Sequence, residues 1–471
     1  MIILLAAGAV TFYPILDNSF TNWDDPAQLM ENPLVRVLSL SNLNRIFITP
    51  VVSEYHPLVT VIFSLEYRLF GLNPYPYHLH SLILHLINGW LVFLLIYRLC
   101  DKVPAALVGA LLFLVHPLQV QAVAWISARK DLVFSFFFLL SLLSYFKYHG
   151  RDKRFFYYLS ILFFLAAILS KTLAVTVPAI ILLWLWVYRR PLRKKDWIDL
   201  LPYLAVSLAF GSLALAMQTV RLPGSAAHLE FSFDNVILLL RNLNFYIARL
   251  VFPFNLSPVY LFPKLIIVWA APAGISLLLI MALTAWFRKC LDARKIIFWS
   301  SGFFLITIFP VLRFIPFTGI EVAANRFVYL PSIGIICLAG YGYYTLKRAA
   351  ENSKFGKIAV IISAVLVIIF LSGISRNRCR IWRDSGTLWT EAVKRQGESD
   401  LLYHMMADSH FRAGRYIETI ELCDQVIALN PAMAYSYLLK SRAQAILGQA
   451  EASAETREHY NGVLEKLGIK R

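Results

Sequence analysis

Apolar runs limit the fold of this chain more than any other feature, because ten of them are about as long as the 17 to 25 residues that a helix needs to cross a bilayer. They occupy residues 79–99, 104–121, 132–148, 155–171, 172–188, 198–218, 264–287, 295–314, 326–346 and 356–374. A shorter run, Met1–Leu16, lacks a basic start and a cleavage site, which predicts a first span and not a removed signal peptide. The sequence therefore predicts an all-α polytopic membrane protein with about 11 transmembrane helices.

Composition agrees with a membrane protein and excludes other classes. Only 15% of the residues are charged, whereas a soluble domain has about 25%. The net charge of +17 does not indicate nucleic-acid binding, because much of it falls in short loops between the apolar runs. Five scattered cysteines without a CxxC pair support neither a zinc ribbon nor a disulfide framework.

The basic loops predict an orientation. Lys and Arg gather after the second, fourth, sixth, eighth and tenth runs, with Met1–Leu16 counted as the first. Because positive loops stay in the cytoplasm, the N-terminus is predicted to be cytoplasmic, and Asp24, Asp25 and the C-terminal region are predicted to lie outside. We expect a multi-pass protein of a bacterial inner membrane with its C-terminal region in the periplasm, or of the endoplasmic reticulum membrane if the protein is eukaryotic.

Two stretches fit this predicted orientation poorly. Asn235–Phe252 is apolar but carries two Arg and two Asn residues in its interior, and counting it as a span would invert the charge rule for every later loop. We interpret it as a re-entrant or interfacial helix within a long outer loop, about 219–263. The basic stretch Arg376–Arg383 is external in this scheme and counts mildly against it.

The sequence divides into a membrane domain, 1–375, and a soluble helical region, 382–471. In the first outer loop, 17–78, two amphipathic pieces are too short to span and are expected along the interface: Ser41–Phe47 and Pro57–Phe70. The second has four residues at helical spacing, which predicts a buried face: Leu58, Ile62, Leu65 and Leu69. In the C-terminal region Gly414 and Gly448 are separated by the 34-residue period of tetratricopeptide repeats, which predicts an extracytoplasmic repeat domain that binds a peptide or protein.

An acidic pair, Asp24-Asp25, follows the first span in a loop with few other acids. The pair is also suited to capping a helix that begins at Pro26, since Pro is favoured at the first helical position after an Asp. A carboxylate at the membrane boundary can instead accept a proton from a hydroxyl nucleophile. The sequence leaves both interpretations open.

Polar residues gather at the outer ends of the spans, whereas ion-driven transporters place ionisable groups at mid-membrane. For each residue alone, anchoring at the interface is the simpler explanation; their joint clustering predicts one polar site on the outer face. Its cations suit a phosphate or pyrophosphate: Arg129, Lys130, Lys171 and Arg326. Further members are His78, His116, Asp131, Gln218 and Glu321, and two additional site candidates are His56 and Tyr329. The histidines lack the carboxylate spacing of a metal motif, so a His-based metal site is disfavoured.

Eight short stretches, in this order, are familiar as a set: Asn22-Trp23-Asp24-Asp25, Tyr55-His56-Pro57-Leu58, Tyr77-His78-Leu79, His116-Pro117-Leu118, Gln121 with Ala122-Val123-Ala124-Trp125-Ile126-Ser127, Arg129-Lys130-Asp131-Leu132, Ser170-Lys171, and Asn325-Arg326-Phe327-Val328-Tyr329-Leu330-Pro331. With the C-terminal repeats they cover nearly the whole chain, which resembles the transmembrane-and-tetratricopeptide-repeat O-mannosyltransferase-like family of GT-C glycosyltransferases. His56 stands where the family leads us to expect Arg, and Gln121 where we expect Glu. The small number of repeats favours a bacterial member.

The resemblance implies an inverting glycosyltransferase that moves a sugar from a polyprenyl phosphate to a hydroxyl of protein Ser/Thr or of a glycan. Asp24, or else Asp25, would be the base, and Lys171, Arg326, Arg129 and Lys130 would stabilise the leaving phosphate. Asp131 would orient the acceptor. A divalent cation, Mg or Mn, is open; Asp25 and Asp131 would be its ligands. Two alternatives are a flippase or transporter for a lipid-linked sugar, which needs a polar path through the spans, and a membrane-anchored repeat scaffold.

Overall fold

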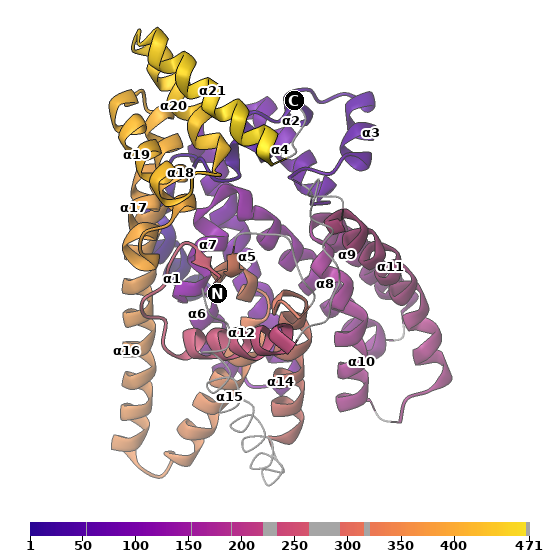
Figure 1. Cartoon of the computed structure of the whole chain (residues 1–471). Coiled ribbons are helices and arrows are strands. Elements are labelled where there is room, and N and C mark those ends of the chain that lie inside the picture. The colour runs from indigo at the N-terminus through magenta and orange to yellow at the C-terminus, as the bar shows by residue number, and fades with distance from the viewer. Residues whose placement is uncertain are drawn as a thin grey trace.

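The computed structural model describes residues 1–52, 54–151, 153–189, 191–219, 233–262, 293–314 and 321–467 (Figure 1). Nearly all regular structure within them is helical, which confirms the predicted all-α class. The described strands, β1 (Tyr260–Leu261) and β2 (Glu321–Ala323), form one antiparallel pair in which Tyr260 lies opposite Ala323.

The α-helices have these bounds: α1 (Ile2–Phe12), α2 (Pro33–Arg36), α3 (Leu40–Ile48), α4 (Pro57–Phe70), α5 (Pro74–Cys100), α6 (Val103–Val115), α7 (Val120–Ala124), α8 (Arg129–Arg151), α9 (Arg154–Ser170), α10 (Val177–Tyr188), α11 (Lys194–Thr219), α12 (Phe233–Val251), α14 (Arg294–Ile308), α15 (Ser332–Ala349), α16 (Lys354–Cys379), α17 (Ser385–Gln396), α18 (Asp400–Arg412), α19 (Tyr416–Leu429), α20 (Ala434–Ile446) and α21 (Ala450–Lys466). Short 3-10 or π turns connect them: η1 (Tyr13–Asp17), η2 (Pro26–Met30), η3 (Pro117–Gln119), η4 (Ile126–Ala128), η5 (Thr172–Thr176), η7 (Phe309–Val311), η8 (Asn325–Val328) and η9 (Arg380–Trp382).

Four segments of the described chain are long and apolar enough to cross a membrane: Pro74–Cys100, Lys194–Met217, Arg294–Val311 and Lys354–Trp382. A bent pair, Val103–Val115 with Pro117–Ala124, makes a fifth if it is one span. The chain is thus an integral membrane protein, with fewer full-length spans in its described part than the eleven predicted. The shorter apolar segments are Ile2–Asp17, Arg154–Ser170 and Thr172–Tyr188, and the predicted span 264–287 lies outside the described residues.

Two predicted spans differ from single straight helices. The run 104–121 bends by 50° after α6, because His116 has an extended backbone and Pro117 has no N–H to continue the helix. The run 326–346 becomes α-helical only at Ser332, since the residues before it form β2 and η8. Both irregular segments carry polar side chains of the predicted site.

The buried face of α4 is not the one predicted. Val59 and Phe63 are fully or almost fully buried, whereas Leu65 and Leu69 are 45% and 71% exposed. The polar side of the helix turns inward because Glu66 forms ion pairs with Arg129 and His80. The exposed leucines remain suited to the membrane interface where α4 was expected to lie.

The core of the membrane region is built from α5, α6, α8, α9, α14 and α15, with α6 packed against both α5 and α15. Glycines set the closest approaches: a Cβ on Gly334 would lie 2.4 Å from the Ser300 carbonyl oxygen, and one on Gly340 equally close to that of Ala105. Figure 1 shows α12 lying across α14 and not beside it.

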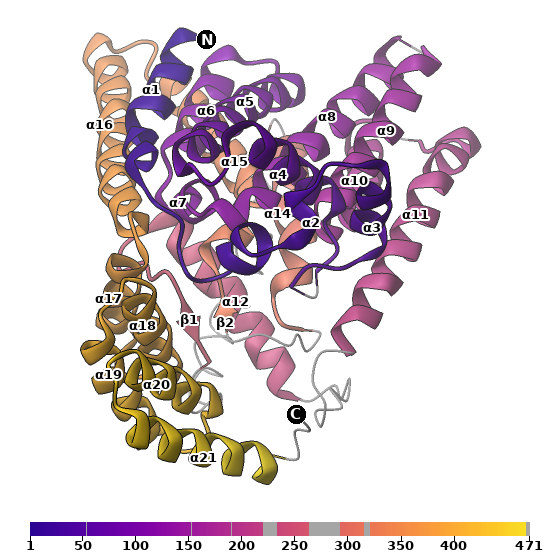
Figure 2. The same ribbon diagram turned by 90° about the horizontal axis from the view of Figure 1, so that it is seen from above.

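The C-terminal helices stack as antiparallel neighbours and lie at the same end of the molecule as α2, α3 and α4 (Figures 1 and 2). Helix starts repeat at the predicted offset of 34 residues, from Asp400 to Ala434 and from Tyr416 to Ala450. Gly414 and Gly448 end the first helix of each pair with φ of +76° and +78°. These positive φ values are readily adopted by glycine alone.

Candidate active site

Asp25 is held by four hydrogen bonds and is 1% exposed. Its Oδ2 accepts from the Thr21 backbone N–H (2.8 Å) and hydroxyl (3.0 Å), and its Oδ1 accepts from the Ser127 backbone N–H (3.0 Å) and hydroxyl. Burial raises the pKa of the Asp25 carboxyl above its usual range, and these four donors oppose the rise. A helical turn does begin at Pro26, but the Asp25 side chain does not cap it. Asp25 therefore ties the loop 17–78 to the segment before α8.

Asp24, next to it, belongs to a charged cluster around Arg326 and is only partly buried. Arg326 Nη2 pairs with Glu321 Oε2 at 2.8 Å. Burial opposes the charge on Arg326, but Glu321, and then Asp131 and Asp24, raise the pKa of the guanidinium. Burial raises the pKa of the Glu321 carboxyl, and the Asp24 carboxylate adds to that rise, although Arg326 opposes it. Asp24 thus lies beside a cation and a carboxyl group, whereas Asp25 faces neutral donors.

A second part of the cluster begins with Asp131, on the first turn of α8. Its Oδ1 accepts from Lys171 Nζ at 2.6 Å. Lys130 pairs with Glu54, and His56 is buried close to that pair. Burial, and then the Lys130 charge, lowers the pKa of His56 to about 4, which keeps its imidazole neutral at physiological pH. The structure therefore brings together six residues predicted from the sequence: Asp24, Arg326, Asp131, Lys171, Lys130 and His56.

Several buried atoms of this cluster have no hydrogen-bond partner in the described part of the chain: Asp131 Oδ2, Glu321 Oε1, Arg326 Nη1 and His56 Nε2. Buried polar groups are normally paired, so each deserves an explanation. Their concentration around one cluster indicates a place prepared for a polar ligand.

Arg129 is placed elsewhere and is completely buried. It forms an ion pair with Glu66, donates to the Tyr77 carbonyl, and lies 3.3 Å from the Ser81 hydroxyl. The aromatic rings of Phe63 and Tyr77 cover its guanidinium. We therefore leave Arg129 out of the proposed phosphate site.

Other predicted site residues have structural surroundings. The Tyr329 hydroxyl lies between His85 (2.9 Å) and Asn88 (3.2 Å) in the core. His116 uses both ring nitrogens, with the Leu250 carbonyl at 3.0 Å and the Leu118 backbone N–H at 3.2 Å.

The last two predicted residues are His78 and Gln218. His78 is buried in the first turns of α5, close to the Arg129 charge, and within the described chain no side-chain hydrogen bond or ion pair joins it to the cluster. Gln218 lies in the last turn of α11, and its side chain is outside the described residues.

The described ranges contain no group of three or more His, Cys, Asp or Glu side chains that could hold one metal ion. The acids of the cluster alternate with cations. Asp25 and Asp131, the predicted ligands, take different partners: Thr21 and Ser127 for the first, Lys171 for the second.

Four tryptophans join the loop 17–78 to the C-terminal helices. Trp23 stacks on Trp125 with centroids 4.6 Å apart, and both contact Trp382. Trp389 lies 5.2 Å from Trp23. Arg326 covers the rings of Trp23 and Trp125 at 5.9 and 5.0 Å. The aromatic stack thus connects the charged cluster to α17.

Asn22 anchors the same loop. Its Nδ2 donates to the Met405 carbonyl (3.0 Å) and to Asp408 (2.9 Å), and its Oδ1 accepts from Trp389 Nε1 (2.6 Å). Its backbone N–H donates to the Ser385 hydroxyl at 2.8 Å. The residue that precedes Trp23 and Asp24 is therefore fixed by α17 and α18.

Sequence reasoning did not place Glu54 in the site, and it counted Glu321 among the polar residues at the outer ends of the spans without giving it a role. Both are acids in stretches poor in charge, and each precedes a predicted site residue, His56 or Arg326, by a few positions. That proximity was the available signal. Gln121, noted for its departure from the family, accepts from the Arg326 backbone N–H at 3.0 Å and so helps to position that residue.

Comparison with known proteins shows similarity to one family over part of the chain. Residues 54–216, about a third of the chain, match the family described as dolichyl-phosphate-mannose-protein mannosyltransferase. The human protein O-mannosyl-transferase TMTC3 is 27% identical over 72% of this chain and 41% of its own length, and human TMTC4 is 25% identical over 72% and 53%. The Drosophila melanogaster Tmtc1 is 33% identical over 36% and 21%. The resemblance to the O-mannosyltransferase-like family is confirmed. The chain is a distant relative that spans about half or less of the length of these proteins.

Among solved structures, that of ArnT from Cupriavidus metallidurans bound to undecaprenyl phosphate aligns with 92% of this chain and 80% of its own. The TM-score is 0.42 and the identity 16%. This similarity is too low to transfer detail.

Proposed function

We propose that this O-mannosyltransferase-like protein is an inverting GT-C glycosyltransferase that transfers a sugar from a polyprenyl phosphate to a hydroxyl group on the extracytoplasmic face. The observation that carries the proposal is the contrast within the acidic pair. The oxygens of Asp25 are occupied by Thr21 and Ser127, while Asp24 shares a cluster with Arg326, Asp131 and Lys171. The acceptor is the hydroxyl of a protein Ser or Thr, or of a glycan.

In the proposed reaction Asp24 takes the proton of the acceptor hydroxyl as the oxygen attacks the anomeric carbon. The bond between that carbon and the phosphate oxygen breaks, and its electron pair leaves with the polyprenyl phosphate. Phosphate needs no general acid, only cations near the developing charge. Arg326, with a buried Nη1 that has no partner among the described residues, and Lys171 are placed for this task.

Neighbouring carboxylates moderate these cations. Each of the three cations forms an ion pair with one carboxylate: Lys171 with Asp131, Arg326 with Glu321, and Lys130 with Glu54. Such pairing holds the cations in place before the donor arrives. Neutral His56 is suited to hydrogen-bond a sugar or acceptor hydroxyl without adding charge.

The test uses full-length protein in nanodiscs with a polyprenyl-phosphate sugar and a Ser/Thr peptide. Asp24→Asn should lower the rate of transfer by about 10² to 10⁴-fold, because it removes the base, and should leave thermal unfolding unchanged. The matched control is Asp25→Asn. It places an amide NH2 group against the donors of Thr21 or Ser127, so it should lower the unfolding temperature. Normal transfer by folded Asp24→Asn protein would refute the proposal.

A further inference from the structure

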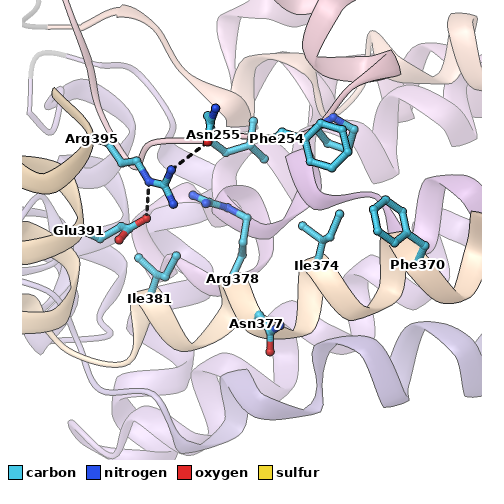
Figure 3. A pocket seen from close by; sticks show the side chains of 11 residues that line it. Phe254, Asn255, Phe370, Ile374, Asn377, Arg378, Ile381, Glu391 and Arg395 are labelled. Atoms are coloured by element: carbon cyan, nitrogen blue, oxygen red, sulfur yellow. Dashed lines mark hydrogen bonds and ion pairs between the residues drawn. The ribbon is translucent and has the colours of Figure 1, made fainter.

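A cleft of about 380 Å³ lies where the end of α16 meets α17 and the segment that follows α12 (Figure 3). None of its lining residues belongs to the cluster around Asp24 and Arg326. The proposed glycosyl transfer gives this cleft no role. It contains Arg378, a member of the basic stretch Arg376–Arg383 that the orientation of the chain did not explain.

One end of the cleft is cationic. Arg395 pairs with Glu391 at 2.7 Å and donates to Asn255 Oδ1 at 3.1 Å. Arg378 points toward the same place in Figure 3. It is only 9% exposed, yet its side chain makes no hydrogen bond or ion pair within the described part of the chain. Two guanidinium groups and one carboxylate leave this end with a net charge of +1.

The other end is apolar and continues along the membrane-spanning helix. Ile374 and Phe370 lie one and two turns before Arg378 on α16, and Phe254 faces them (Figure 3). The rings of Phe254 and Phe370 are 47% and 54% exposed. Since Lys354–Trp382 is long and apolar enough to span, the cleft lies at one boundary of the bilayer, with its apolar end toward the hydrocarbon.

We propose that this cleft binds one anionic phospholipid of the outer leaflet, with its phosphate on Arg378 and Arg395 and an acyl chain along Ile374 and Phe370. Guanidinium groups bind phosphate oxygens in a planar, bidentate arrangement. A phosphodiester carries one negative charge, which matches the net +1 of the cleft, whereas a phosphate monoester carries nearly two. The lipid supplies the partner that buried Arg378 lacks in the described chain, and it explains a basic stretch on the outer side.

The lipid would also hold three segments together, because the segment after α12, α16 and α17 all contribute to the cleft. A ligand that binds the folded state alone stabilises it by RT ln(1 + [L]/Kd), a free energy that grows with ligand concentration. We therefore expect phosphatidylglycerol to raise the unfolding temperature of the wild-type protein more than phosphatidylcholine does.

The experiment places full-length protein in nanodiscs of equal phosphatidylglycerol and phosphatidylcholine, transfers it to detergent, and counts retained lipids by native mass spectrometry. Wild type should retain phosphatidylglycerol preferentially, and Arg378→Gln should retain at least about tenfold less, as expected for loss of a charge-assisted contact of about 1.5 kcal/mol or more. The matched control is Arg383→Gln, an exposed arginine paired with Asp384, which should behave as wild type. Phe370→Ser, at an exposed position, tests the apolar end if Arg378→Gln fails to fold, and should also reduce retention.

Three results would overturn the proposal. One is equal retention of phosphatidylglycerol by wild type and by folded Arg378→Gln, or by Phe370→Ser if the arginine variant does not fold. Another is that wild-type protein retains phosphatidylcholine as well as it retains phosphatidylglycerol. The third is that a polyprenyl phosphate, and not phosphatidylglycerol, is lost from Arg378→Gln, which would make the cleft part of the donor site. Sugar transfer by Asp24→Asn is independent of all three, so this proposal and the proposed function can fail separately.

Discussion

Two charged networks start from neighbouring residues of α8 and differ in how completely their polar atoms are paired. Arg129 is enclosed by Glu66, the Tyr77 carbonyl and Ser81. Asp131, two residues later, pairs with Lys171 through one oxygen and leaves the other buried without a partner in the described chain. Successive residues of a helix point about 100° apart, so one short motif serves two separate sites.

The comparison suggests a way to separate scaffold from site. A fully paired buried charge stabilises its surroundings only while its partner remains, and removing one partner costs about 3–5 kcal/mol. A network with unpaired buried atoms has given up some stability, and functional sites are where such a loss is commonly tolerated. By this criterion we assign Arg129 to the scaffold and propose Arg326, Asp131 and Lys171 as members of the site.

The sharpest test exchanges the two arginines for glutamine, one at a time. Arg326→Gln should lower transfer by about 10² to 10³-fold, because it removes a charge beside the leaving phosphate, with little change in unfolding. Arg129→Gln leaves Glu66 buried and partly unpaired, so it should destabilise the protein by about 3–5 kcal/mol. Transfer rates and thermal unfolding of both variants are measured in the same nanodiscs.

The opposite assignment would follow from the opposite pattern. If Arg129→Gln remained as stable as wild type but lost transfer, the paired network would take part in catalysis. If Arg326→Gln unfolded easily and kept its activity in the folded fraction, the Asp24 cluster would be scaffold. Lys347→Gln, on the last turn of α15 at the predicted cytoplasmic side, controls for loss of positive charge in general.

The sequence was sufficient for the helical class, the membrane location and the resemblance to the O-mannosyltransferase-like family, because these depend on apolar length and on motifs in order. It did not distinguish Arg129 from Arg326. Both are cations in motifs at the predicted outer face, and only the fold brings Glu66 to one and Glu321 to the other. The choice of partner is made across more than sixty residues of chain in the first case, which no local pattern encodes.

Helical phase explains a second error. The apolar spacing of α4 predicted that Leu65 and Leu69 are buried, but an amphipathic helix in a membrane protein has two apolar environments available. The protein interior took the side with Val59, Phe63 and Glu66, since Glu66 must meet Arg129 and His80. In a soluble protein the same leucines would have had to face the core.

Substitution of Asn22 tests whether a residue whose polar atoms are all paired supports catalysis indirectly, by holding the loop that carries Asp24. The side-chain bonds of Asn22 reach Met405, Asp408 and Trp389 on the C-terminal helices. Asn22→Ala should therefore lower kcat by about tenfold by loosening the loop that carries Asp24, since small displacements of a catalytic group cost 10 to 10²-fold.

Two kinds of acceptor distinguish whether Asn22 positions Asp24 or helps the C-terminal helices to recruit the substrate. A short Ser/Thr peptide and a folded protein acceptor should lose the same factor in kcat with Asn22→Ala. A rise in KM for the protein acceptor alone would instead show that α17 and α18 only recruit the substrate. Asn461→Ala, on α21 and outside this contact, is the matched control.

The smallest expected effect is the pH dependence of stability that His56 contributes. Its Nε2 is unpaired among the described residues, and its pKa is lowered to about 4, chiefly by burial. In the unfolded chain the imidazole takes up a proton near pH 6.5, so between pH 6.5 and 4 the unfolded state binds more protons and stability falls as the pH falls. The loss attributable to His56 approaches about 3 kcal/mol at pH 4. His56→Gln should flatten the pH dependence of thermal unfolding in this window, whereas His459→Gln, on an exposed face of α21, should not. If stability depended on pH in His56→Gln as it does in wild type, His56 would not be buried beside Lys130 in the folded protein. The cluster around Asp24 and Arg326 would then contain no neutral imidazole.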